Sequence, residues 1–191
     1  MDSYYTIAQD TVSEIRERSS RFIAYAKRVS TATEAEDYVK KLRKEHHAAR
    51  HHCYAYRLGL GGKLNRANDD GEPSGTAGRP ILGQLMSAGV TDVVVVVVRY
   101  FGGILLGTSG LIAAYGDSTA LVIKDAGKEE VVLKEWVRKE VDFANLDRVM
   151  KIVKKRELKT KPIEYTAQGC AIEIEVRLSE LEDLTTELRD I

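Results

Sequence analysis

The spacing of apolar and polar residues predicts regular structure over the first two thirds of the chain. Residues 4–7, 21–29 and 51–58 are predicted as strands, and apolar and polar side chains nearly alternate along 21–29. Between the second and third of these strands, Thr33 is followed three residues later by Glu36, the pattern of a capping box that opens a helix. Apolar residues then recur at helical spacing, so we expect a helix between these strands.

Six consecutive valines, 93–98, form the most apolar segment of the chain. β-branched residues without alternation indicate a strand covered on both faces, at the centre of its sheet. Two glycine-rich loops, 68–80 and 99–107, flank this strand, and each precedes a predicted helix. The second of these helices has Thr108 or Ser109 as its expected N-cap.

After residue 128 the pattern of elements starts again. We predict a strand at 130–143, a helix capped by Asn145, strands at 163–167 and 170–178, and a final helix from Ser179. The order β-α-β-β-α is that of a split βαβ unit without its closing strand. The sequence therefore predicts two α+β domains, with boundaries at 1–128 and 129–191.

Composition indicates a globular protein in a reducing compartment. Apolar residues make up 43% of the 191 residues and charged residues 30%, as in ordinary folded domains. Cys53 and Cys170 fall in different halves of the chain, which suggests free thiols. The N-terminus lacks the pattern of a signal peptide, and the longest apolar run is too short to span a bilayer. We expect a cytoplasmic protein without membrane contact.

The net charge is zero, whereas a protein that coats nucleic acid is usually basic overall. One local exception is the predicted helix after Asn145, which carries a secondary basic patch of Arg148, Lys151, Lys154 and Lys155. These cations are either the solvated side of an amphipathic helix or additional phosphate contacts.

No metal site and no cofactor are predicted. His47 and His51 have the spacing of two helical metal ligands, but the chain leaves the helix between them and no second thiol lies near Cys53. His51 and Cys53 share a strand face, yet no third group is available to orient a catalytic pair. We therefore interpret Cys53 as a buried thiol.

The two glycine-rich loops are the best candidate for a binding site. The second has the glycine spacing of a phosphate-binding loop, but Thr108 stands in place of the lysine. Nucleotide hydrolysis is therefore not expected, although free N–H groups at a helix N-terminus can still bind phosphate. If both helix N-termini line one crevice, its anion- or nucleic-acid-binding residues would be Arg79, Arg99, Gly102, Gly103, Thr108 and Ser109.

Two alternatives remain open for these loops. Asp70 and Glu72 could act as acid and base in a hydrolase or phosphotransferase, but the same residues are typical of a glycine-rich turn with helix caps. Arg99 could bind an anion, or it could pair with Asp92, Asp117 or another carboxylate and only hold its loop in place.

The two loops also carry a family resemblance. The segments DGEPSGTAGRP (70–80) and RYFGGILLG (99–107) resemble the signature of the IMPACT (YigZ-like) family. The resemblance extends upstream through 20–24 and 50–57, and residues 129–191 resemble the small C-terminal domain of the bacterial members.

This resemblance implies a fold and a setting. The family's N-terminal domain is similar to the second domain of ribosomal protein S5, and its C-terminal domain is ferredoxin-like and similar to a domain of elongation factor G. Both of these analogues contact RNA on the ribosome, and the eukaryotic relatives regulate translation. The implied function is a non-catalytic binding protein that contacts RNA, the ribosome or a translation factor; a hydrolase and a protein–protein adaptor are the alternatives.

Overall fold

The computed structural model describes residues 2–191, which form two compact units. Tyr4–Val131 make up the N-terminal unit, and the C-terminal unit is built on Val132–Ile191. The strands are β1 (Ser3–Ile7), β2 (Thr11–Glu17), β3 (Ser20–Arg28), β4 (His51–Leu58), β5 (Leu64–Asn68), β6 (Val93–Tyr100), β7 (Lys128–Val132), β8 (Lys134–Val141), β9 (Lys159–Thr160), β10 (Glu164–Tyr165) and β11 (Cys170–Arg177). The helices are α1 (Ala32–Glu45), α2 (Gly78–Ala88), α3 (Gly107–Ala126), α4 (Leu146–Lys155) and α5 (Leu181–Arg189), with short 3₁₀ turns at Leu60–Gly62 and Leu178–Glu180.

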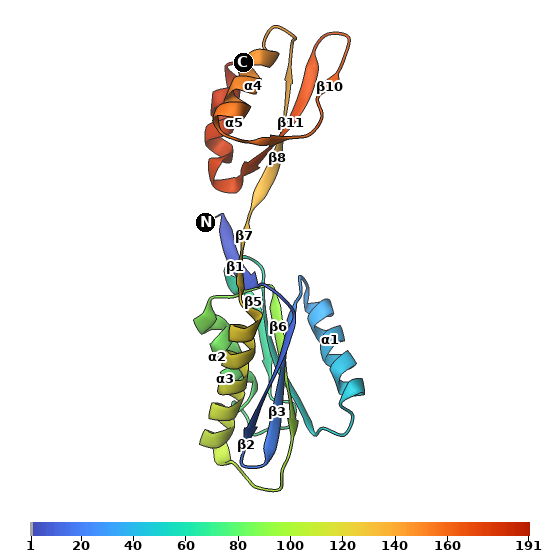
Figure 1. Cartoon of the computed structure of the whole chain (residues 1–191), viewed down its shortest axis with the longest axis vertical. Coiled ribbons are helices and arrows are strands. Elements are labelled where there is room, and N and C mark those ends of the chain that lie inside the picture. The colour runs from blue at the N-terminus through green and yellow to red at the C-terminus, as the bar shows by residue number, and fades with distance from the viewer. Residues whose placement is uncertain (1) are drawn as a thin grey trace. The chain divides into compact units, whose positions relative to one another are not determined.

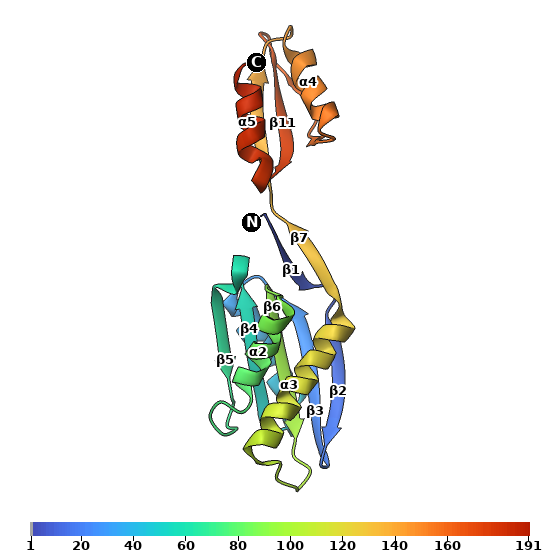
Figure 2. The ribbon, with the colours of Figure 1, turned by 90° about the vertical axis from the view of Figure 1, so that its left-hand side faces the viewer.

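The valine strand β6 lies at the centre of the N-terminal unit. The five-stranded sheet has the order β2-β3-β6-β4-β5, and all four pairings are antiparallel. Helix α1 covers one face, and α2 and α3 cover the other (Figures 1 and 2). Successive valines point to opposite faces, so Val93, Val95 and Val97 enter the core under α2 and α3, and the other three enter the core under α1. The structure confirms a strand buried on both faces.

Two expected helix caps differ from the structure. Helix α1 begins two residues earlier than predicted, because Thr31 Oγ1 accepts the Glu34 N–H at 3.1 Å and Glu34 Oε2 accepts the Ser30 N–H at 2.8 Å. Thr31 is therefore the N-cap, and the Glu34 carboxylate reaches back to the residue before it. Neither Thr108 nor Ser109 caps α3, whose first turn receives no hydrogen bond from a capping side chain. Helices α2 and α3 end at Gly89 and Gly127, and both glycines have a positive φ.

The C-terminal unit contains an antiparallel sheet with two helices against one core. Strand β11 pairs with β8 on one side and with the short strands β9 and β10 on the other. The apolar sides of α4 and α5 meet Ile172, Ile174 and Val176 of β11. Among residues 2–191, no strand pairs with the outer edge of β8.

Three strand predictions need correction. The single strand expected at 130–143 is two strands, because β7 pairs with β1 whereas β8 pairs with β11. The strand expected at 163–167 is reduced to Glu164–Tyr165. Strands β2 and β5, the two edges of the five-stranded sheet, were not predicted.

None of the helices within residues 2–191 is long and apolar enough to cross a bilayer.

Candidate functional site

A cavity of about 350 Å³ lies between the two glycine-rich loops of the N-terminal unit. Its polar wall consists of Arg50, His51, Glu72, Arg99 and Thr108. The rest of the wall is mostly apolar and comes from Pro73, Phe101, Leu105, Leu106 and Leu111. The cavity therefore combines two cations with an apolar surface, at the end of β6 where α3 begins.

The centre of this wall is a buried ion pair. Arg99 Nη1 donates to Glu72 Oε1 at 2.6 Å, and the two side chains are only 6% and 4% exposed. Tyr115 Oη donates to the same carboxylate oxygen at 2.7 Å. Burial raises the pKa of Tyr115, and the neighbouring Cys53 and Glu72 raise it further, so the phenol stays a neutral donor. Glu72 is thus held by one cation and one hydroxyl.

The Arg99 guanidinium is enclosed on several sides. It lies 5.4 Å from the ring centroid of Phe22 and 5.5 Å from that of Phe101. Its Nη2 is 3.4 Å from Ser20 Oγ. Its Nε is buried and has no hydrogen-bond partner among the described residues. The guanidinium is therefore fixed by its contacts with Glu72, Ser20 and the two rings, and Nε is shielded from solvent.

His51 lies beside the ion pair in a defined orientation. In the β4–β6 pairing it is directly opposite Arg99. Its Nδ1 is 2.8 Å from the backbone carbonyl of Asp70, and because a carbonyl can only accept, this nitrogen carries the proton. Its Nε2 lies 3.9 Å from Glu72 Oε2.

The two acids of the hydrolase alternative have different surroundings. Asp70 accepts hydrogen bonds from Arg43 Nη2 and from the backbone N–H of His52, each at 2.7 Å, and it does not line the cavity. Glu72 does line the cavity, but its Oε1 is already bound by Arg99 and Tyr115. Each carboxylate is therefore paired with its own arginine. Such charge-assisted hydrogen bonds hold the first glycine-rich loop in place and leave neither acid free to exchange a proton with a substrate.

A third acid, Asp69, organises the first loop. Its carboxylate accepts the backbone N–H groups of Gly75, Ala77 and Gly78 at 2.9, 3.1 and 2.8 Å, and so caps α2 from a distance in sequence. Burial alone would raise the pKa of Asp69, but the three N–H groups together lower it. Asp69 thus connects the loop to the start of α2.

We expect Asp69→Asn to lower the free energy of unfolding by about 1–3 kcal/mol at neutral pH, because hydrogen bonds to a charged acceptor are lost. In the wild type this contribution is complete above the ordinary carboxyl pKa of 3.8 and is lost as the pH falls through the lowered value. Urea unfolding followed by circular dichroism should therefore show the wild type and the variant converging towards pH 3. A constant difference across that range would mean that the charge of Asp69 is not what stabilises the loop.

The structure brings only some of the predicted binding residues to the cavity. Arg99 and Thr108 line it, whereas Arg79, Ser109 and Gly103 are exposed and are not part of its wall. The N–H of Gly102 is 3.3 Å from Ser20 Oγ. Arg50, His51, Phe101 and Leu105 also line the cavity but were not among the predicted binding residues. All four fall in the segments 50–57 and 99–107 that carry the family resemblance.

The remaining sequence candidates offer no reactive group. Cys53 is buried, its thiol is 3.0 Å from the Asp69 carbonyl oxygen and 3.3 Å from Tyr115 Oη, and burial raises its pKa. A thiol in such surroundings is a poor nucleophile. No group of three or more His, Cys, Asp or Glu side chains within residues 2–191 is arranged to hold a metal ion.

The basic patch belongs to α4 of the C-terminal unit. Arg148, Lys151, Lys154 and Lys155 are all exposed there, while Val149 and Val153 of the same helix are buried. Lys151 is paired with Asp147 at 2.7 Å. The helix is thus amphipathic, and its cations face solvent.

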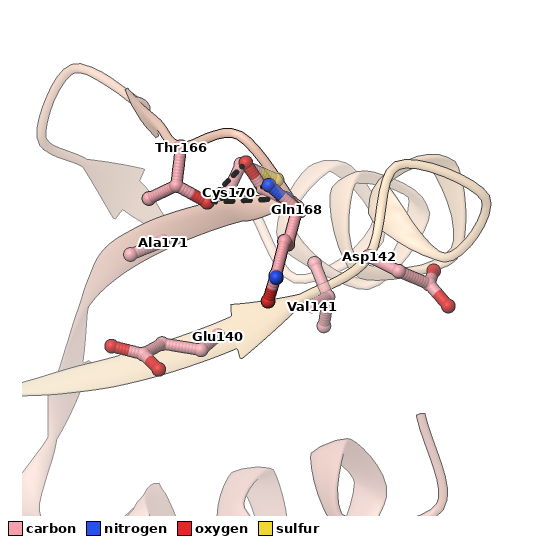
Figure 3. Close-up of a pocket in the computed structure, with 8 residues that line it drawn as sticks. Glu140, Val141, Asp142, Thr166, Gln168, Cys170 and Ala171 are labelled. Atoms are coloured by element: carbon pink, nitrogen blue, oxygen red, sulfur yellow. Dashed lines mark hydrogen bonds between the residues drawn. The ribbon is translucent and has the colours of Figure 1, made fainter.

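A second hollow of about 350 Å³ lies in the C-terminal unit, where β8 ends and β11 begins. Thr166 and Gly169 close a turn beside it through hydrogen bonds of 2.8–3.1 Å. Figure 3 shows the carboxylates of Glu140 and Asp142 on opposite sides of Gln168. These polar groups do not converge on one point, so this hollow is a weaker candidate than the cavity beside Arg99.

Comparisons with known proteins agree on one group of relatives. The sequence profile described as Impact N-terminal domain matches residues 18–123. IMPACT family member YvyE of Bacillus subtilis is 38% identical over 95% of this chain and 82% of its own length, and IMPACT family member YigZ of Escherichia coli is 49% identical over 55% of this chain and 52% of its own. A solved structure titled as that of a hypothetical protein superposes with a TM-score of 0.71 at 30% identity, over 100% of this chain and 93% of the other.

Proposed function

Because the chain belongs to the IMPACT family, we propose that it is a non-catalytic binding protein of the translation machinery, which contacts RNA through the cavity between its two glycine-rich loops. The observation that carries this proposal is the composition of the cavity wall. Arg50 supplies positive charge that the Arg99–Glu72 pair leaves unbalanced, and Phe101 and Leu105 supply exposed apolar surface beside it. Cations next to an exposed aromatic ring are what single-stranded nucleic acids require.

The state of the carboxylates supports binding over catalysis. General acid–base catalysis needs a group that can exchange a proton with the substrate. Glu72 Oε1 accepts from Arg99 and Tyr115, and Asp70 accepts from Arg43 and the His52 backbone. Both acids are therefore already engaged in the folded protein.

The translation setting comes from the family resemblance of the two domains. In that resemblance, both domains are similar to parts of proteins that contact RNA on the ribosome. A shared fold does not by itself assign a function, so the proposal depends on whether this cavity binds RNA.

We expect Leu105→Glu to weaken the binding of single-stranded RNA about three- to tenfold, because it adds a negative charge to the cavity wall. Leu105 is 80% exposed, so this change should leave the fold intact. Binding of a short, fluorescently labelled RNA is followed by anisotropy at low and at physiological salt, and co-sedimentation with purified ribosomes is measured in parallel.

The matched control is Leu64→Glu, the same substitution at a 55% exposed position on β5 outside the cavity. It should change RNA affinity by less than about twofold. Equal effects of the two substitutions would remove the cavity from the proposal. If the wild type binds neither RNA nor ribosomes, a translation factor becomes the partner to test.

A further inference from the structure

The start of α3 gives the cavity an anion-binding end. Gly107 and Thr108, the first residues of this 20-residue helix, line the cavity, and no capping side chain hydrogen-bonds to its first turn. The first N–H groups of a helix have no partner within the helix, and the helix dipole places partial positive charge there. Such a terminus accommodates a phosphate oxygen.

The charge of the wall points to the same kind of ligand. Arg99 is buried in the cavity wall and is paired there with Glu72. Glu72 also lines the cavity, but Arg99 offsets its charge, so the exposed Arg50 leaves the wall with a positive balance.

The apolar part of the wall has the shape and chemistry for a planar group. Phe101 is 40% exposed, and it already lies 5.5 Å from the guanidinium of Arg99. Leu105, 80% exposed, belongs to the same wall. Nucleobases stack on aromatic side chains that are flanked by arginine.

We propose that the cavity holds a single unpaired nucleotide, with its phosphate at the first turn of α3 beside Arg50 and its base against Phe101 and Leu105. The volume of about 350 Å³ is within the range of sites that enclose small ligands. This inference rests on the proposed function and specifies its ligand: one nucleotide, either free or as part of an RNA chain.

The test compares 5′-AMP, adenosine and inorganic phosphate by isothermal titration calorimetry. We expect 5′-AMP to bind at least tenfold more tightly than either part alone, because both ends of the cavity are then used. Arg50→Ala should weaken 5′-AMP about five- to tenfold and leave adenosine unchanged, because a charge-assisted contact to phosphate is lost. Phe101→Ala should weaken both 5′-AMP and adenosine, since both lose the stacking surface.

The matched control is Arg79→Ala, which removes the same charge from an exposed position outside the cavity wall. It should leave all three titrations unchanged. The inference is overturned if 5′-AMP binds no more tightly than phosphate, or if Arg79→Ala acts as strongly as Arg50→Ala.

A short single-stranded RNA, titrated into the same variants, distinguishes the two sources of the nucleotide. If RNA binding depends on Arg50 and Phe101 more than 5′-AMP binding does, the nucleotide is part of a chain; the reverse result identifies a free nucleotide. RNA binding that Leu105→Glu weakens, without any 5′-AMP binding, would preserve the proposed function and refute this inference. Binding of 5′-AMP without binding of RNA or ribosomes would support a nucleotide in this cavity and refute the proposed function in RNA binding.

Discussion

Replacing Val96 with aspartate is expected to prevent the N-terminal unit from folding. Val96 is fully buried on the α1 side of β6, opposite Tyr25 of β3 and Tyr54 of β4. The core around it is built from apolar and tyrosine side chains. An unpaired carboxylate in such a place costs several kcal/mol, which is comparable with a whole domain stability of about 5–15 kcal/mol.

Circular dichroism and chemical denaturation measure this directly. The matched control is Val12→Asp, the same change at a 55% exposed position on the edge strand β2. The control should unfold cooperatively with a midpoint close to that of the wild type. A soluble Val96→Asp protein with a cooperative transition would show that the centre of the sheet tolerates a charge, and β6 would then not be the strand on which both cores depend.

Replacing Arg99 with alanine is expected to lower the free energy of unfolding by about 3–5 kcal/mol, the usual cost of leaving a buried partner charge unpaired. Glu72, 4% exposed, would retain only the hydroxyl of Tyr115 and a distant His51. The change also removes the guanidinium between the rings of Phe22 and Phe101. Thermal and urea unfolding measure the loss.

Two further variants give this prediction its controls. Arg66→Ala breaks a pair with Glu36 whose side chains are 50% and 39% exposed, and it should cost only about 0–1 kcal/mol. Adding Glu72→Gln to Arg99→Ala should recover part of the loss, because the unpaired charge is then removed as well. A loss no larger than that of Arg66→Ala would mean that Arg99 is not a structural partner of Glu72.

Local patterns in the sequence were sufficient for the centre of the fold. Six valines without alternation indicate a buried strand wherever they occur, and Gly89 and Gly127 end helices because of their own conformational freedom. The capping box was misplaced because Thr31 and Thr33 are each followed three residues later by a glutamate, so the pattern fits twice. Strand β5 was missed because an exposed edge strand shows no apolar alternation.

The site was harder to predict because its contacts join distant parts of the chain. Glu72 and Arg99 are 27 residues apart, and no local pattern pairs them. Asp92, which the sequence offered as a partner, lies just before the strand that ends near Arg99; at about 3.3 Å per residue the two are too far apart to meet. His51, by contrast, does lie next to Arg99. No local pattern predicts this neighbour either, because it depends on the pairing of β4 with β6.

Because β6 belongs to both cores, its amide protons are protected from solvent on two sides. The strand hydrogen-bonds to β3 and β4, and its valines reach the cores under α1 and under α2 and α3. If α1 opens locally, the core under α2 and α3 still covers β6, and the reverse is also true. We therefore expect the amides of β6 to exchange with deuterium only when the whole unit unfolds. The exchange rates of these amides therefore report the global stability of the unit, whereas β2 and β5, paired on one side only, exchange through smaller openings.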